Sequence, residues 1–165
     1  MQASSIAERI AGIPRRELDG ITISGGEPFD QPEGLFTLLS ELSEWRGDDD
    51  IDLLAYSGYS LERLRSRHRQ ALQLLDAVIP GSYQRGKPTR RIWRGSANQE
   101  IVALSALARE RYPDYYAYEP ERPPIQVAVD ESIWLIGVPR EGDLLRLEQL
   151  VQVNSIEIEG PSWRP

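Results

Sequence analysis

Three short loops carry the residue types best suited to bind a ligand in this chain of 165 residues. They read SGGEP at residues 24–28, SGY at residues 57–59 and GSY at residues 81–83. Glycine lets a ligand approach the backbone, and hydroxyl and carboxylate groups can hydrogen-bond to it. Each loop follows a short apolar run that reads as a strand. Because ligands bind beyond the carboxyl ends of parallel strands, the three loops predict one binding edge.

The composition limits the chemistry that these loops can perform. The sequence has no Cys and one His, so it offers no thiolate for a disulfide, a zinc site or an iron–sulfur cluster. A triad with a histidine base would have to use His68. That residue lies on the apolar stripe of an expected helix, which favours a packed or boundary histidine. We therefore expect neither metal ligands nor a catalytic residue.

The charge balance narrows the range of partners. A net charge of −7 argues against non-specific binding to nucleic acid or to an anionic membrane. No apolar run approaches the roughly 20 residues that span a bilayer, and the N-terminus lacks the pattern of a signal peptide. A cytoplasmic protein without nucleic-acid or membrane partners is expected. A cluster of cations around Trp93 is a local exception to this acidic balance. It indicates either a lid or dock for an anionic ligand or partner, or a solvated loop. Its members are Arg85, Lys87, Arg90, Arg91 and Arg94.

Helical and strand patterns alternate along the chain, which predicts an α/β fold with a parallel sheet. A late pair of strands joined at residues 130–131 predicts an antiparallel hairpin. The length fits one domain, which we place at residues 1–153, followed by a loose tail at residues 154–165. The expected helices cover residues 4–13, 32–46, 61–75, 98–111 and 144–151, and the expected strands cover residues 21–23, 51–56, 76–79, 125–129 and 133–138.

Motifs in a fixed order resemble a known family. The GGEP sequence at residues 25–28 resembles the strand end of radical S-adenosylmethionine enzymes. The YSGY sequence at residues 56–59, WRGSANQ at 93–99 and GVP at 137–139 resemble segments of the proteins that activate anaerobic ribonucleotide reductase and other glycyl-radical enzymes. GGEP alone is a weak signal, whereas the ordered set is specific. One departure is PGS at residues 80–82, where the family has an acid-Gly-Pro turn.

The resemblance implies two cofactors, S-adenosylmethionine and a 4Fe-4S cluster. In the family, a C-x-x-x-C-x-x-C loop that precedes GGEP holds the cluster, but this sequence has no Cys. We therefore expect a partial (β/α) barrel-like parallel sheet that lacks its first strand and the cluster loop. A C-terminal antiparallel hairpin and a helix would complete the fold.

The resemblance also implies a set of ligand-binding residues. The amino group of S-adenosylmethionine needs hydrogen-bond acceptors, which exposed glycine carbonyls and a carboxylate can supply. A plain strand-to-helix turn is the alternative for the same residues. Residues 93–99 are expected to serve the cofactor edge or a partner dock. The binding residues carried over from the family motifs are Gly25, Gly26, Glu27, Pro28, Ser57 and Tyr59.

Three functions stay open at this point. The first is a protein like the radical S-adenosylmethionine activating enzymes, incomplete or cluster-free, acting on a glycyl-radical enzyme such as anaerobic ribonucleotide reductase. The second is a non-catalytic scaffold of the same fold that binds S-adenosylmethionine, a nucleotide or a partner. The third is an unrelated α/β domain. Tyrosines that follow the basic cluster could form a partner surface or pack internally: Tyr112, Tyr115, Tyr116 and Tyr118.

Overall fold

The computed structural model defines residues 3–120, 126–129, 133–136 and 142–153 of the chain. These residues form two compact units, Met1–Glu119 and Pro120–Pro165. A single domain over residues 1–153 stays a prediction.

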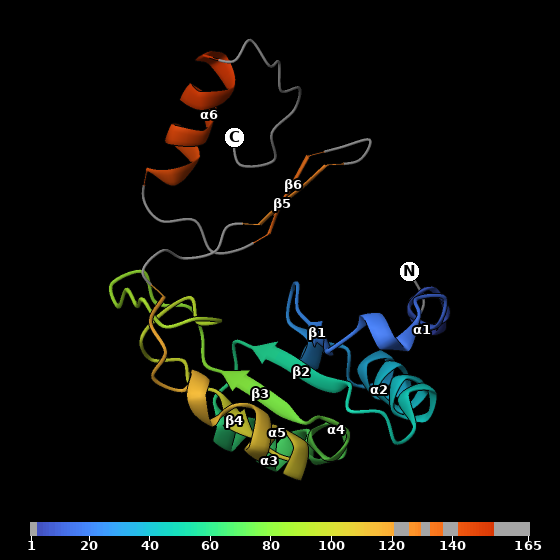
Figure 1. Cartoon of the computed structure of the whole chain (residues 1–165). Helices are drawn as coiled ribbons and strands as arrows, with labels where there is room; N and C mark the ends of the chain where they lie inside the picture. The colour runs from blue at the N-terminus through green and yellow to red at the C-terminus, as the bar shows by residue number, and fades with distance from the viewer. Residues whose placement is uncertain (1–2, 121–125, 130–132, 137–141, 154–165) are drawn as a thin grey trace. The chain divides into compact units, whose positions relative to one another are not determined.

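The first unit is built on a four-stranded sheet in the order β1-β2-β3-β4. Strands β1 (Gly20–Ile23), β2 (Asp52–Ser57) and β3 (Ala77–Pro80) are parallel, and the arrows of β2 and β3 run side by side in Figure 1. The short β4 (Val102–Ala103) pairs with β3 in the antiparallel direction. This mostly parallel, open α/β sheet confirms the predicted fold class and is consistent with a partial barrel. Strand β1 lies at one edge of the sheet.

One face of the sheet is covered by helices from the first half of the chain: α1 (Ala3–Ala11), α2 (Pro32–Arg46), α3 (Leu61–Arg67) and α4 (Arg69–Leu74). Leu39 and Leu42 of α2 are fully buried in one cluster with Leu53 of β2. Helix α2 begins at a proline, which is well suited to a first helical turn, and ends where Gly47 takes a φ of 57°. The apolar stripe of α2 therefore follows the predicted period.

The opposite face is covered by α5 (Ala106–Arg111) and the residues after it. Leu54 of β2 and Ile79 of β3 pack there with Tyr112. Because β2 has partners on both faces, its central residues Leu53, Leu54 and Ala55 are successive, apolar and buried, as is usual for an inner parallel strand.

Two predicted helices differ from the structure. The helix expected over residues 61–75 is interrupted at His68, which ends α3 and precedes α4 with φ −128° and ψ 32°. Its ring lies between those of Phe29 and Tyr59, with centroids 5.2 Å and 6.1 Å away, so the packed or boundary reading of this histidine is confirmed. The helix expected over residues 98–111 is wrong in its first half, because only residues from Ala106 onward are helical.

The second unit contains β5 (Gln126–Val129), β6 (Ile133–Ile136) and α6 (Asp143–Val153). The two strands pair in the antiparallel direction, which confirms the predicted hairpin and the last helix. The GVP motif at residues 137–139 and the tail at residues 154–165 lie outside the described residues. None of the helices in the described ranges is both long and apolar enough to cross a membrane.

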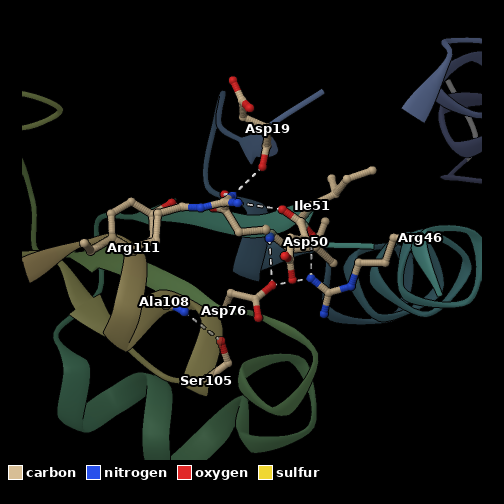
Figure 2. A network of polar contacts seen from close by, with 11 residues as sticks. Asp19, Arg46, Asp50, Ile51, Asp76, Ser105, Ala108 and Arg111 are labelled. Atoms are coloured by element: carbon tan, nitrogen blue, oxygen red, sulfur yellow. Dashed lines mark hydrogen bonds and ion pairs between the residues drawn. The ribbon is translucent and has the colours of Figure 1, made fainter. Parts of the chain in front are cut away.

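Two buried carboxylates, Asp76 and Asp52, lie at the strand ends opposite the predicted binding loops, and Figure 2 shows Asp76 with its partners. Asp76, 3% exposed, accepts hydrogen bonds from Leu53 N at 2.8 Å and from the Arg46 guanidinium, which also donates to Ile51 O. The backbone carbonyl of Asp76 accepts from Leu104 N and Ser105 N. Asp76 therefore ties α2, β2 and the start of α5 together.

The second carboxylate, Asp52, pairs with the guanidinium of Arg111 and accepts a hydrogen bond from the Tyr112 hydroxyl. Arg111 also donates to the carbonyls of Asp19 and Asp50 (Figure 2). Arg111 thus joins the end of α5 to the segments that precede β1 and β2.

Candidate functional site

The three predicted loops meet at one edge of the sheet. They surround a small hollow of about 130 Å³, which we call the strand-end pocket. The loops follow β1, β2 and β3, so the parallel order of the strands is what brings them together. The residues that line the strand-end pocket are Ser24, Gly25, Gly26, Tyr56, Ser57, Gly58, Gly81, Tyr83 and Gln99.

Glu27 joins two of these loops. One carboxylate oxygen, Oε1, accepts from Ser57 Oγ at 2.9 Å and from Phe29 N at 3.1 Å. The other, Oε2, accepts from Gly58 N at 2.6 Å. A carboxylate has about four acceptor positions, so these three donors leave about one for a ligand. Glu27 therefore holds the loops after β1 and β2 at a fixed separation beside the pocket.

The other predicted residues of these loops divide into two groups. Ser57 lines the pocket, and its hydroxyl donates to Glu27 and accepts from Tyr59 N at 3.0 Å, so the donor of Ser57 is already used. Pro28 begins a short 3₁₀ turn, Pro28–Asp30, that Glu27 caps. The Tyr59 side chain does not line the pocket; its hydroxyl donates to Asp30, and the Arg63 guanidinium lies 3.5 Å from its ring centre. The hydrogen bond to Asp30 is the largest cause that raises the pKa of Tyr59.

Gly25 and Gly26 form the floor of the loop after β1. Their φ angles are 96° and 53°, a region that residues with a Cβ rarely adopt. A Cβ at either position would meet no atom within 4 Å, so it would project into open space. The backbone groups of both glycines make no hydrogen bond to the described residues, which leaves them available to a ligand.

The WRGSANQ segment closes the third side of the pocket. Gln99 Oε1 accepts from Gly95 N and Ser96 N, while its Nε2 donates to Gly81 O at 2.7 Å. Asn98 Nδ2 donates to Ser82 O at 2.9 Å. The segment therefore fixes the loop after β3, and Gln99 itself reaches the pocket lining.

Trp93 and Arg94 occupy unusual positions in the same segment. Trp93 has a φ of 60°, and its carbonyl accepts from the Tyr56 hydroxyl at 2.6 Å. Arg94 is buried and donates to Tyr116 O at 2.6 Å, while its Nε has no hydrogen-bond partner within the described residues. Burial, and then the charge of Arg91, lower the pKa of Arg94.

A larger cavity of about 520 Å³, which we call the aromatic cavity, lies on the α5 face of the sheet. Asp52 and Arg111, already paired with each other, contribute to it. Tyr56 lines both the aromatic cavity and the strand-end pocket. Aromatic rings form much of the wall: Tyr56, Trp93, Tyr112 and Tyr115.

Tyr56 also predicts how stability depends on pH. Burial raises the pKa of Tyr56 from 10.0 to about 12, so the folded protein holds this proton more tightly than the unfolded chain. The resulting stability is complete below pH 10.0 and is lost as the pH rises through about 12. We expect Tyr56→Phe to flatten the decline of the unfolding free energy in this range, as measured by urea unfolding.

The control for this prediction is Tyr83→Phe, because the Tyr83 side chain is 63% exposed. This variant should follow the wild-type curve. The pKa of the buried Tyr112 is also raised, by burial and by its hydrogen bond to Asp52. Because both variants keep Tyr112, part of the fall in unfolding free energy at high pH remains in each of them. If the unfolding free energy of Tyr56→Phe fell with pH as steeply as that of the wild type, the contribution assigned to Tyr56 would be wrong.

The donor set does not fit a 4Fe-4S cluster. Such clusters are held by cysteine thiolates, and the sequence contains none. In the described part of the chain, no three His, Asp or Glu side chains gather where they could hold a metal ion. The strand-end pocket has only uncharged lining residues, with the Glu27 carboxylate beside it.

Sequence reasoning found the three loops but missed two residues that line the pocket. Gln99 belongs to the segment at residues 93–99, which was expected to serve the cofactor edge or a partner dock without a specific contact for Gln99. Tyr56 was placed at the end of a strand and in the YSGY motif, but it was given no binding role. Its alternation with Leu54 along β2, which places both on one face, is the signal that could have found it.

Curated proteins named anaerobic ribonucleoside-triphosphate reductase-activating protein are similar to this chain. The protein from Enterobacteria phage T4 is 28% identical over 100 residues, which are 59% of this chain and 62% of that protein. The protein from Haemophilus influenzae is 35% identical over 89 residues, 53% of this chain and 57% of that protein. The protein from Pasteurella multocida is 35% identical over 95 residues, 55% of this chain and 60% of that protein.

The matched region thus spans only 57–62% of the length of these relatives. No solved structure matches the chain significantly. The family described as "4Fe-4S single cluster domain" matches residues 1–102, the part that contains β1 to β3 and the loops of the strand-end pocket. The chain therefore belongs to this family, within the activating-protein group of the radical S-adenosylmethionine superfamily.

Proposed function

We propose that the chain takes part in the activation of an anaerobic ribonucleoside-triphosphate reductase and binds the amino-acid end of S-adenosylmethionine at the strand-end pocket. One observation carries this proposal. The Glu27 carboxylate joins the two glycine-containing loops across a hollow at the carboxyl ends of parallel strands. The names of the similar proteins support the choice of partner.

The size of the pocket supports binding of one end of the molecule. Complete small-molecule sites usually enclose about 300–1,000 Å³. A hollow of about 130 Å³ is much smaller, so it suits an amino-acid moiety and leaves the nucleoside outside. The free backbone groups of Gly25 and Gly26 would hold the amino group, with the remaining acceptor position of Glu27 beside them.

When bound, S-adenosylmethionine supplies the sulfonium group whose reductive cleavage starts the chemistry of this superfamily. The residues of this chain bind and orient the amino-acid end: Glu27 positions the loops, and Ser57 positions Glu27. Gln99 keeps the loop after β3 in place at the third side. The sequence itself supplies no thiolate ligand for a cluster.

The missing thiolates favour a second candidate function. A scaffold that binds S-adenosylmethionine or the partner without catalysis needs the same pocket but no cluster. Reconstitution of the 165-residue chain with iron and sulfide under anaerobic conditions tests whether the chain can hold a cluster. We expect no visible absorbance of a bound cluster, and the appearance of such absorbance would overturn the scaffold.

Binding of S-adenosylmethionine can be tested at the glycine floor. We expect Gly25→Ala to weaken binding by about 1–2 kcal/mol, roughly tenfold in Kd, because Gly25 lines the pocket with a positive φ that a residue with a Cβ would strain. Isothermal titration calorimetry measures the change. Wild-type chain that takes up no S-adenosylmethionine would overturn the proposed ligand.

The matched control is Gly34→Ala in the first turn of α2. A Cβ there also meets no atom within 4 Å, but this glycine has no positive φ. The substitution should stabilise the protein by about 0.5–1 kcal/mol and leave binding unchanged. Equal loss of binding in both alanine variants would contradict a specific role for the loop after β1.

A further inference from the structure

A cluster of cations lies in the segment that reaches the strand-end pocket through Gln99. Residues 84–99 carry five of the 19 basic residues and no acidic residue, which leaves 14 basic and 26 acidic residues in the rest of the chain. Four of these cations are exposed, and within the described residues none of the four pairs with a carboxylate. They are Arg85, Lys87, Arg90 and Arg91.

Exposed aromatic rings lie among these cations. Trp93 is 41% exposed and packs against Tyr115 with ring centroids 4.8 Å apart. Tyr118 is 51% exposed and contacts the edge of Tyr115. Arginine, tyrosine and tryptophan are the residue types most enriched in protein interfaces.

The backbone of this region is held in place without a partner. Ala97 N donates to Lys87 O at 2.8 Å, and Ile92 N donates to Tyr118 O at 3.3 Å. The Tyr56 hydroxyl fixes the carbonyl of Trp93. A surface that is ordered before binding loses less conformational entropy when a partner docks.

We propose that a basic–aromatic surface, formed by Arg85, Lys87, Arg90, Arg91, Trp93 and Tyr118, docks an acidic surface of the reductase. This inference rests on the proposed function, because that function supplies the partner. Tyr83 connects the two sites: it lines the strand-end pocket and packs against Gly95 in the same loop. A protein docked on this surface would therefore lie next to the bound S-adenosylmethionine.

A protein partner fits the charges better than nucleic acid does. The acidic remainder of the chain would repel a long polyanion, whereas a protein can present a local acidic patch to the loop. A second copy of this acidic chain could also supply such a patch. Nucleic acid and self-association are therefore outcomes that the experiment must separate.

The experiment compares two triple charge reversals of the full chain for binding to the purified anaerobic reductase of the same organism. The test variant is R85E/R90E/R91E. The control is R65E/R67E/R69E, which makes the same charge change at exposed positions on and beside α3. We expect the test variant to raise Kd about tenfold or more at low salt, and the control to change it less than about twofold.

Higher salt should weaken wild-type binding and bring it close to that of the test variant. Circular dichroism of both variants checks that each is folded. Equal losses in the two folded variants overturn the docking surface but leave the proposed partner intact. A wild-type chain that does not bind the reductase overturns both. Two other outcomes also overturn docking of the reductase. In the first, the wild-type chain forms a dimer that only the test variant loses. In the second, the wild-type chain binds a DNA duplex tightly and only the test variant loses that binding.

Discussion

Asp76→Ala is expected to lower the free energy of unfolding by about 3 kcal/mol, because removing one partner of a buried ion pair leaves the other uncompensated. The carboxylate of Asp76 accepts from Leu53 N, and its partner Arg46 has a side chain only 15% exposed. Loss of the carboxylate therefore leaves the Arg46 cation without its counter-charge, with only Ile51 O as an acceptor, and Leu53 N without an acceptor in a buried place (Figure 2). Urea unfolding followed by circular dichroism measures the change.

The control is Asp48→Ala, at an exposed position after α2, which should change stability by less than about 0.5 kcal/mol. Asp76→Asn keeps one oxygen acceptor and removes the charge, so it should fall between the two. If Asp76→Ala were as stable as the control, the network would contribute nothing to folding.

Glu27→Ala is expected to raise the Kd for S-adenosylmethionine about thirtyfold, which corresponds to about 2 kcal/mol, the size of one hydrogen bond to a charged group. Without the carboxylate, Ser57 Oγ and Gly58 N lose their shared acceptor. The loops after β1 and β2 then lose the link that fixes their separation. Isothermal titration calorimetry gives the affinity.

Ser57→Ala removes one of the three donors to Glu27 and should have a smaller effect than Glu27→Ala. Glu44→Ala, an exposed carboxylate of α2, serves as the control and should bind like the wild type. An unchanged affinity in Glu27→Ala would show that the amino-acid end binds elsewhere.

The sheet could be predicted from the sequence because each β–α unit obeys local rules. Runs such as residues 53–56 are apolar on both faces, and a glycine or proline follows within two residues. The meeting of Glu27 with Ser57 followed from the parallel order of β1 and β2, although the spacing of 30 residues says nothing about it. The binding edge could therefore be predicted from the parallel arrangement of the strands.

The first half of the helix expected over residues 98–111 could not be predicted, because distant groups decide its structure. Ile101, Leu104 and Ala108 have helical spacing, but Gln99 binds Gly81 O across the strand-end pocket. Leu104 N donates to Asp76 O instead of to a carbonyl of its own turn. These tertiary bonds outweigh local propensity.

The interruption at His68 was hidden for a different reason. Helices α3 and α4 cover the same face of the sheet, with Leu64 and Leu72 in one cluster. The apolar stripe therefore continues through the break, and periodicity alone cannot reveal it.

Tyr56 gives the molecule an intrinsic optical reporter. Its ring lines both the strand-end pocket and the aromatic cavity, and its hydroxyl holds the carbonyl of Trp93. Any molecule that shifts this ring from either side must alter the surroundings of the indole. Emission from Trp93, isolated by replacing the other three tryptophans with phenylalanine, should therefore report occupancy at both places without an added dye.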